Sequence, residues 1–253
     1  MTMDADIGVV ITSHNYGRYL KACLESVLGQ TLVPQEVVVV DDASEDDTED
    51  VVRDFEGVRY FCVDFRNGNR ARNFGFKQLT CSYVTFFDAD NLMMPTFLAH
   101  LYQALKQDDQ AAFAYCDRIN FSDSDAEWYP QPMGLVRVGR FDTDRLRAGN
   151  YIDLAALIRT TWFSGFDEGL RRYQDWDLWL NIALMQNGYG CYVSEPLFRY
   201  RVHGDNISRY EDRDLAMWHI RRKYRLGWGR LPFLRHSYRA YSLVSRLKRY
   251  WIQ

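Results

Sequence analysis

The sequence predicts an α/β protein with a doubly wound, mostly parallel sheet and helices on both faces. Short apolar runs rich in β-branched residues recur along the first half, and amphipathic segments separate them. Polar residues follow several of these runs directly. Strands and helices that alternate at this spacing are typical of a parallel sheet covered by helices. The second half is less regular, and the C-terminal segment is predicted to be a helical extension.

The elements of the first half follow from the periodicity of the apolar residues. Strands are expected at residues 7–12, 36–41, 58–63 and 83–87. Helices are expected at residues 18–28, from an N-cap at Ser44, and at residues 70–79.

The second half is predicted as a mixture of helices, short strands and a long loop. Helices are expected at residues 95–106 and 174–186, strands at 111–116, 191–193 and 198–202, and a loop at 122–140.

Composition indicates a globular protein, because 47% of the 253 residues are hydrophobic and 26% are charged. No apolar run reaches the roughly 18 residues that a membrane-spanning helix needs. The acidic stretch at residues 1–6 is not expected to be a secretory signal. Five cysteines without a C-x-x-C pair indicate reduced thiols, and we expect a cytoplasmic protein.

Charge is distributed unevenly along the chain. Residues 213–253 contain 11 basic residues and one acid, a formal charge of +10, whereas the remainder contains 20 basic and 33 acidic residues, a charge of −13. One interpretation of the basic, aromatic extension is a peripheral anchor on an anionic membrane surface. The alternative is a helical pair that packs on the acidic body or on a second copy of the chain. Nucleic acid is not an expected partner, because the body is acidic.

Polar residues cluster where three of the predicted strands end. They are Thr12-Ser13-His14-Asn15, Asp41-Asp42 and Asp88-Ala89-Asp90. In open α/β sheets, ligands bind beyond the carboxyl ends of the strands. The sequence therefore predicts a ligand site at this edge.

The two aspartates after the fourth strand are candidate metal ligands. Asp88 and Asp90 would suit a hard divalent cation whose other ligands are water and phosphate oxygens. Such a cation would neutralise a diphosphate leaving group. The alternative is a turn in which an aspartate caps the next helix. Asp42 likewise either caps a turn or accepts a hydrogen bond from a nucleobase or ribose.

Five motifs, in order, resemble those of family 2 glycosyltransferases with the Rossmann-like GT-A fold. They are VVITSHNYGRYL (9–20), VVDDAS (39–44), ARNFG (71–75), FDADN (87–91) and YQDWDL (173–178). The resemblance extends from about residue 7 to residue 208. It implies an inverting transferase that uses a nucleotide-diphosphate sugar, usually UDP-linked, together with Mn²⁺ or Mg²⁺.

The resemblance also implies roles for individual residues. The nucleoside and diphosphate would be bound by Thr12, Ser13, His14, Asn15, Asp42, Arg72, Asp88 and Ala89. Asp90 would be the main metal ligand, assisted by Asp88 and by His203. Asp175 would be the general base that takes a proton from the acceptor hydroxyl.

Two positions depart from the usual family pattern. His14 stands where many members have a tyrosine, and Gln174 stands where a glutamate usually precedes the base. The glutamine removes a like charge, so the pKa of Asp175 should be less raised than beside a glutamate. Asp177 is a rival for the base but is expected to be structural. Trp176 is either a core residue or a platform for an acceptor sugar, and Trp179 is expected in the core.

The predicted organisation is a catalytic domain at residues 1–212 and a basic extension at residues 213–253. Within the domain, a donor half covers about 1–115 and an acceptor half about 116–212. The acceptor would be a glycan or a lipid-linked glycan in surface polysaccharide or lipopolysaccharide synthesis, and the protein would be cytoplasmic or peripheral on the inner face of the membrane. The rival hypotheses are a non-catalytic module that binds a nucleotide sugar or glycan, and a sugar nucleotidyltransferase. The latter class needs a glycine-rich basic loop after the first strand, which this chain lacks.

Overall fold

The computed structural model describes residues 5–123, 133–204, 206 and 213–227. The chain divides into two compact units, Met1–Glu211 and Asp212–Gln253. The first unit contains the sheet and the candidate site. In the described part of the second unit, α8 spans Arg213–Lys223. No helix in the described ranges is both long enough and apolar enough to cross a membrane.

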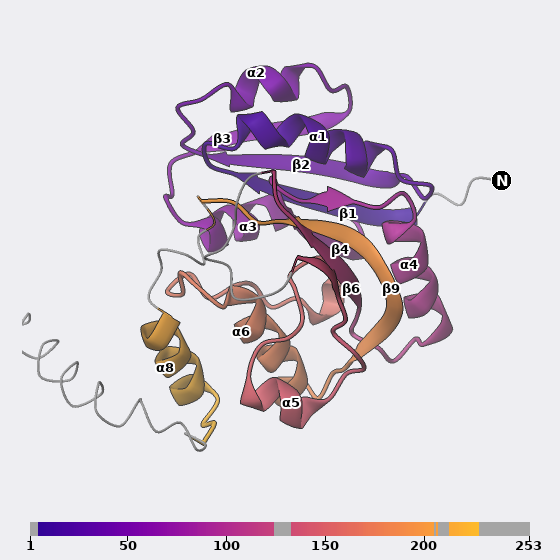
Figure 1. Cartoon of the computed structure of the whole chain (residues 1–253), viewed down its shortest axis with the longest axis vertical. Coiled ribbons are helices and arrows are strands. Elements are labelled where there is room, and N and C mark those ends of the chain that lie inside the picture. Colours follow the sequence, from indigo (N-terminus) through magenta and orange to yellow (C-terminus); the bar gives the residue numbers. More distant parts are fainter. Residues whose placement is uncertain (1–4, 124–132, 205, 207–212, 228–253) are drawn as a thin grey trace, which may run out of the picture. The chain divides into compact units, whose positions relative to one another are not determined.

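The strands of the first unit form one curled sheet, which crosses the centre of Figure 1. Among the described residues its order is β3-β2-β1-β4-β8-β6-β9-β5, with β7 beside β6. The strands are β1 (Ala5–Ser13), β2 (Pro34–Asp42), β3 (Val58–Val63), β4 (Tyr83–Asp88), β5 (Leu92–Met93), β6 (Phe113–Phe121), β7 (Gly134–Val136), β8 (Ala156–Arg159) and β9 (Gly190–Arg201).

The sheet is mixed but mostly parallel. β1 pairs in parallel with β2 and with β4, β2 pairs in parallel with β3, and β6 pairs in parallel with β9. β8 runs antiparallel to both β4 and β6, so β4 and β6 point in the same direction. β5 and β7 are antiparallel to β9 and β6. The carboxyl ends of the parallel strands therefore face one edge, where the predicted site residues of β1, β2 and β4 lie.

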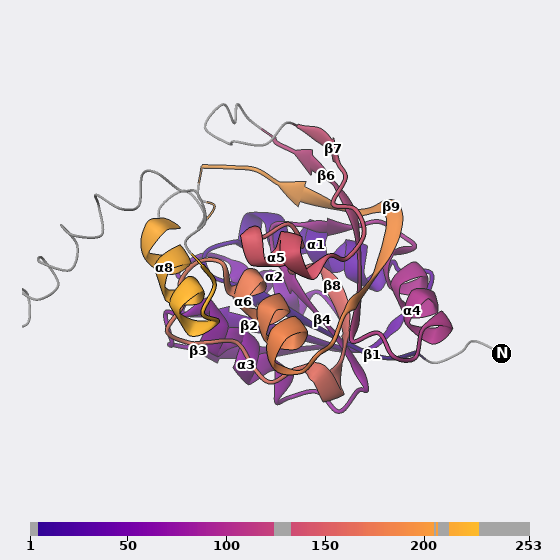
Figure 2. The same ribbon diagram turned by 90° about the horizontal axis from the view of Figure 1, so that it is seen from below.

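Helices cover both faces of the sheet. They are α1 (Gly17–Leu28), α2 (Thr48–Arg53), α3 (Gly68–Phe76), α4 (Phe97–Gln107), α5 (Thr143–Ala148) and α6 (Gln174–Leu180), with a 3₁₀ turn at Thr160–Trp162 and a π turn at Asn181–Met185. Figure 2 shows the same helices from below. α1 and α4 share a buried cluster with one face of the central strands, whereas α3 packs on Val38 and Val40 of the other face.

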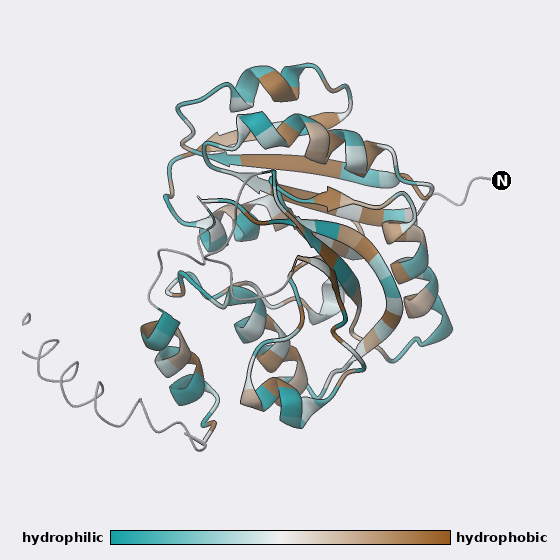
Figure 3. Cartoon of the chain, viewed as in Figure 1, coloured by the Kyte–Doolittle hydropathy of each residue, from teal (hydrophilic) through white to brown (hydrophobic). Residues whose placement is uncertain are grey.

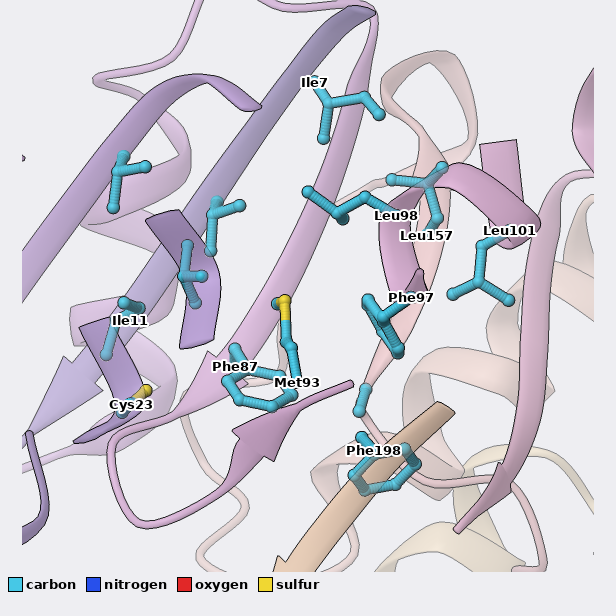
Figure 4. Close-up of a cluster of buried hydrophobic side chains, with 14 of the residues drawn as sticks. Ile7, Ile11, Cys23, Phe87, Met93, Phe97, Leu98, Leu101, Leu157 and Phe198 are labelled. Atoms are coloured by element: carbon cyan, nitrogen blue, oxygen red, sulfur yellow. The ribbon is translucent and has the colours of Figure 1, made fainter. Parts of the chain in front are cut away.

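The main core lies between the central strands and helices α1 and α4. Figure 4 shows part of it, with side chains from both halves of the first unit in one cluster: Ile7, Ile11, Cys23, Phe87, Met93, Phe97, Leu98, Leu101, Leu157 and Phe198. Figure 3 shows the same segregation by hydropathy, because the middle of β2 is hydrophobic and its ends are hydrophilic. This burial fixes the strand ends that carry the site.

The predicted fold class is confirmed, and most of the predicted elements are present. The helix expected from Ser44 is wrong in its start, because α2 begins at Thr48 and the Asp46 carboxylate accepts from the Thr48 amide. The strands expected at 191–193 and 198–202 are one strand, β9, whose register shifts between them. The loop expected at 122–140 contains β7, and residues 124–132 lie outside the described residues.

None of the five cysteines forms a disulfide, as expected from their spacing. Cys23, Cys81 and Cys116 are buried, whereas Cys62 is exposed.

Candidate active site

The strand register brings the predicted polar residues of β1, β2 and β4 to one edge. Thr12 lies opposite Asp88 in the β1–β4 pair, and Ser13 lies opposite Asp41 in the β1–β2 pair. Each of these four residues is the last or the next-to-last residue of its strand. The sequence therefore placed these groups together correctly, as the rule for open α/β sheets requires.

His14 lies just beyond β1 and is held in one tautomer. Its Nδ1 is 2.6 Å from the carbonyl oxygen of Asp42. A carbonyl oxygen only accepts, so in neutral His14 the proton is on Nδ1 and Nε2 keeps its lone pair. The Asn15 side-chain amide lies 3.4 Å from Nε2. The exposed imidazole therefore presents an acceptor at the edge of the sheet.

Asn15 connects the loop after β1 to the loop after β2. Its backbone is left-handed, with φ of 59°. Its backbone amide donates to Ser44 Oγ at 2.8 Å, and its side-chain oxygen accepts from the Glu45 backbone amide at 2.8 Å. Ser44, predicted as a helix cap, is instead part of this connection between the two loops.

Asp42 organises the loop that leads into α3. Its carboxylate accepts from three consecutive backbone amides, those of Phe65, Arg66 and Asn67, at 2.6, 2.7 and 2.6 Å. The residue is only 5% exposed. A bond from this carboxylate to a nucleobase would have to form in addition to these three. The adjacent Asp41 has a turn role, accepting from the Ser44 amide at 3.0 Å.

Arg72 of α3 and Asp88 of β4 form an ion pair at 2.7 Å. The Arg72 side chain is 6% exposed and that of Asp88 is 35% exposed. A buried guanidinium thus holds one carboxylate oxygen at the sheet edge, and the rest of that carboxylate faces outward. Ser13 is buried and its hydroxyl has no partner among the described residues. Ala89 is fully buried, so only its backbone could face a ligand.

Asp90 and His203 meet although 113 residues separate them. His203 Nε2 lies 2.9 Å from Asp90 Oδ2, and the Asn206 amide donates to the same oxygen at 3.3 Å. Arg201 Nε donates to the Asp90 carbonyl at 2.9 Å. Burial raises the pKa of the Asp90 carboxyl above its ordinary value, while the hydrogen bond from His203 opposes that shift. The predicted association of these two side chains is present.

The side chains of Asp88, Asp90 and His203 are suitable ligands for a divalent cation. Two carboxylates supply the hard oxygen ligands that Mg²⁺ and Mn²⁺ prefer, and imidazole also suits transition metals. Within the described ranges, no group of three or more His, Cys, Asp or Glu side chains is already arranged to hold a metal ion. Such a cation would therefore take several ligands from water or from a bound diphosphate.

Asp175 is the second residue of α6, and the residue that precedes the helix, Tyr173, has a left-handed backbone. Tyr173 has φ of 61°, a conformation that residues other than glycine adopt mainly where the surroundings enforce it. Asp175 Oδ2 accepts from the Asn150 amide at 2.7 Å, and Oδ1 accepts from the Trp176 backbone amide at 2.8 Å. Both oxygens are thus held in a defined orientation.

The surroundings of Asp175 raise its pKa to about 6, chiefly because burial disfavours the charged form. The negative charge of Asp153 acts in the same direction, and so does that of Asp88. The Trp176 amide and Asn150 stabilise the carboxylate and oppose the shift. A carboxylate with a pKa close to neutrality can accept a proton under physiological conditions.

The remaining candidates on α6 are core residues. Trp176 is 1% exposed and donates to the Leu146 carbonyl at 2.7 Å, which excludes the alternative that it stacks on an acceptor sugar. Trp179 is fully buried, stacks on Phe113 at 4.3 Å and donates to the Ile152 carbonyl. Asp177 is 4% exposed.

Two residues near the candidate base were not predicted. Asn150 bonds to Asp175, and Asp153 pairs with the buried Arg118 at 3.4 Å. Both lie between α5 and β8, in a segment without a motif or a clear periodicity. The sequence offers no signal for them, because their partners are distant along the chain.

Known proteins similar to this chain are glycosyltransferases. A family model described as glycosyl transferase family 2 matches residues 8–170. The glycosyltransferase GlyA of Streptococcus pneumoniae is 30% identical in an alignment 227 residues long, which covers 83% of this chain and 32% of that protein. An uncharacterized glycosyltransferase of Rickettsia typhi is 25% identical over 78% of this chain and 64% of its own length. The chain thus spans about a third to two thirds of these relatives.

Solved structures resemble the fold at lower sequence identity. TarS of S. aureus, in complex with UDP-GlcNAc, has a TM-score of 0.69 and 17% identity, covering 86% of this chain and 65% of that one. The mannosyltransferase PcManGT of Pyrobaculum calidifontis, in complex with GDP-Man and Mn²⁺, has a TM-score of 0.64 and 19% identity, covering 86% and 63%. At these identities the likeness supports the fold.

Proposed function

The chain is an enzyme that belongs to glycosyl transferase family 2, and on this premise we propose that it is an inverting, metal-dependent transferase. It would move a sugar from a nucleotide-diphosphate sugar, UDP-linked by preference, to an acceptor hydroxyl. The observation that carries this proposal is the charged cluster at the carboxyl end of β4, where Arg72 pairs with Asp88 at 2.7 Å and His203 lies 2.9 Å from Asp90. The negative charge of Asp88 also acts on Asp175, in the same direction as burial.

The donor would lie across the carboxyl ends of β1, β2 and β4. Thr12, Ser13, His14 and Asn15 would contact the nucleoside, with Asp42 ordering the adjacent loop. Support comes from the strand register and from two structures of the same fold, one holding UDP-GlcNAc and the other GDP-Man. These groups lie in residues 1–115, which we assign as the donor half, and Asp175 lies in the acceptor half, residues 116–212.

Asp88 and Asp90, with His203, would hold Mn²⁺ or Mg²⁺ at the diphosphate. The cation would supply charge neutralisation for the departing nucleoside diphosphate. Asp88 is the more exposed of the two carboxylates, while Asp90 is buried and oriented by His203. Arg72 would keep Asp88 in place and add positive charge near the leaving group.

Asp175 would act as the general base. Its carboxylate would take the proton of the acceptor hydroxyl while that oxygen attacks the anomeric carbon. Attack would occur on the face opposite the departing diphosphate, so the single displacement would invert the configuration. The acceptor proposed here is a glycan or a lipid-linked glycan, in the synthesis of a surface polysaccharide or lipopolysaccharide.

A thermal-shift panel tests the donor and metal assignments together. UDP, GDP, dTDP and CMP are each added with and without Mn²⁺. A ligand that binds only the folded state, at a hundredfold excess over its Kd, stabilises that state by about 2.7 kcal/mol. We expect one nucleotide to raise the Tm, and only in the presence of Mn²⁺.

The Asp90→Ala variant is expected to lose the metal-dependent shift, because it removes the buried carboxylate that His203 orients. Asp109→Ala is the matched control, since Asp109 is an exposed carboxylate on the loop after α4. If Asp90→Ala kept the full shift, the metal assignment would be wrong. If no nucleotide shifted the wild-type Tm, the proposed donor class would fail.

A further inference from the structure

The segment that precedes the candidate base has little secondary structure of its own. Residues 163–173 connect the 3₁₀ turn at Thr160–Trp162 to α6 and contain neither a helix nor a strand. Backbone carbonyls near the core need hydrogen-bond partners from elsewhere when no helix or strand supplies them. In this segment, asparagine side chains from α3 and from its N-cap supply several of these partners.

Two asparagines of α3 bind this segment directly. Asn73 donates to the Phe166 carbonyl at 3.0 Å and accepts from the Phe166 amide at 2.8 Å. Asn69 donates to the carbonyls of Asp167 and Leu170 at 2.8 and 2.9 Å. Asn69 is 3% exposed, so both of its bonds are shielded from water. Each of these contacts joins two residues that are 93 to 101 positions apart in the chain.

A third asparagine, Asn67, has two tasks. Its side-chain oxygen caps α3 by accepting from the amides of Asn69 and Arg70. Its side-chain nitrogen donates to the Glu168 carbonyl at 2.8 Å. The residue is 8% exposed. One side chain thus sets the start of the helix and also binds the segment before α6.

The same helix is fixed to the donor side of the site. The loop that enters α3 is held by the three amide bonds to Asp42, and Arg72 of α3 pairs with Asp88. The start of α3 therefore contacts the carboxyl ends of β2 and β4 as well as residues 166–170. Asp175 follows only five residues after this bound stretch.

We infer that Asn67, Asn69 and Asn73 form a clamp that positions Asp175 relative to the donor site. The clamp ties the base-carrying segment to the same helix that carries Arg72. These asparagines are positioning residues, because they act on Asp175 through the backbone of residues 166–170. The inference rests on the proposed function in that Asp175 is taken as the base.

The test combines Asn67→Ser with Asn73→Ala in the full chain. Serine is an N-cap comparable to asparagine, so Asn67→Ser keeps the start of α3 and removes only the amide donor. Alanine is the best helix former, so Asn73→Ala removes both bonds to Phe166 without weakening α3. The variant therefore removes three of the five side-chain bonds from the asparagines to the backbone of residues 166–170, keeps the two of Asn69, and retains the helix.

Gln30→Ala is the matched control. Its buried amide also donates to two backbone carbonyls, those of Ser26 and Met94, at 3.0 and 2.7 Å, and its oxygen accepts from the Leu98 amide. Gln30 joins distant segments as the clamp does, but none of its contacts involves residues 163–175. It reports the general cost of losing a buried amide.

Three measurements are made on each protein. Hydrogen–deuterium exchange follows residues 163–177, and titration with UDP and Mn²⁺ gives the nucleotide Kd. Release of UDP from UDP-GlcNAc, with water as the acceptor, gives kcat. GDP and GDP-mannose replace these probes if the wild type prefers GDP. In this reaction a water oxygen bonds to the anomeric carbon, the bond to the diphosphate breaks, and Asp175 takes the water proton.

We expect the clamp variant to exchange faster across 163–177 and to lose about tenfold to a hundredfold in kcat, with the nucleotide Kd within about twofold of wild type. Gln30→Ala should leave both the exchange of 163–177 and kcat unchanged. Unchanged exchange in the clamp variant would overturn the inference, and so would faster exchange with unchanged kcat. A wild type without turnover on either donor would count against the proposed function, and the exchange of 163–177 would still decide whether the clamp exists.

Discussion

At the scale of single residues, the environment of Asp175 determines what the site can do. Burial and the charges of Asp153 and Asp88 favour the protonated form, and two N–H donors favour the carboxylate. The balance leaves a pKa of about 6, so the group is mostly ionised at neutral pH and is still basic enough to accept a proton. Asp177, two residues along, is more deeply buried and is less suited to meet an acceptor.

Replacing Asp175 with asparagine is expected to abolish transfer and preserve donor binding. The variant keeps the size of the side chain but cannot accept the proton, and general-base catalysis contributes about 10²- to 10⁴-fold to a rate. We expect kcat to fall by that amount, measured as release of nucleoside diphosphate, with an unchanged Kd for the nucleotide. Normal turnover by Asp175→Asn would show that another group is the base.

The pH profile provides a second test of the same residue. Because the base must be ionised, kcat/KM should fall about tenfold per pH unit below pH 6. Asp153→Asn removes a like charge, which lowers the pKa of Asp175 and moves this acid limb to lower pH. Asn150→Leu removes an N–H donor, which raises that pKa and moves the limb to higher pH. If the acid limb moved in the same direction in both variants, or moved in neither, the assignment of Asp175 as the base would be contradicted.

At the scale of helices and strands, the sequence predicted what local pattern determines. The central strands were located because long β-branched runs, such as the four valines of β2, are buried on both faces. The short strands β5, β7 and β8 were missed, since two to four residues carry no readable alternation. The predicted helix at 174–186 is divided into α6 and a π turn, which periodicity does not distinguish.

The candidate site divides in the same way. Thr12, Asp42, Asp88, Asp90 and Asp175 belong to motifs and could be identified from the sequence. Their supporting contacts could not, because the bonds to Asp175, Asp90 and the segment before α6 join residues 25 to 116 positions apart. Such pairs leave no local pattern and depend on the completed sheet.

The packing of α3 on the sheet leads to a prediction on stability. A Cβ at Gly75 would lie 2.5 Å from Val10 Cγ1 and 2.9 Å from Val40 Cγ2, both in the core. Overpacking of this kind costs about 1–3 kcal/mol. At about 2–4 °C per kcal/mol for a domain of this size, Gly75→Ala should lower the Tm by several degrees.

Gly149→Ala is the control for this change. A Cβ there meets nothing within 4 Å, and the φ of 178° is ordinary extended backbone. Its Tm should stay close to that of the wild type. Equal Tm values for the two variants would show that the close approach of α3 to β1 and β2 is not needed for stability.

At the scale of the whole molecule, the notable feature is the opposite charge of the two units. Residues 213–253 carry a formal charge of +10 and the remainder −13. The described part of the extension includes α8, which ends with Arg221, Arg222 and Lys223. Residues 228–253 of the extension lie outside the described residues. Vesicle binding distinguishes a membrane anchor from a helical pair that packs on the acidic body or on a second copy of the chain.

We propose that residues 213–253 bind an anionic membrane surface, which would suit a lipid-linked acceptor. A basic segment gains about 1 kcal/mol of binding free energy per lysine or arginine near an anionic membrane surface. Tryptophan and tyrosine prefer the membrane–water interface. The full chain should therefore sediment with vesicles rich in phosphatidylglycerol and not with phosphatidylcholine vesicles. Because salt screens this attraction, binding should weaken between 0.05 and about 0.5 M salt.

Two variants separate the membrane anchor from its alternatives. A chain ending at residue 212 should lose vesicle binding and keep the nucleotide-dependent rise in Tm, because the proposed donor site lies in the first unit. Replacing the basic residues of 230–249 with glutamine in the full chain should also abolish binding while retaining the aromatic residues. Equal vesicle binding by the truncated and full chains would exclude the anchor. A truncated chain that is monomeric where the full chain is dimeric would identify the extension as a contact between two copies.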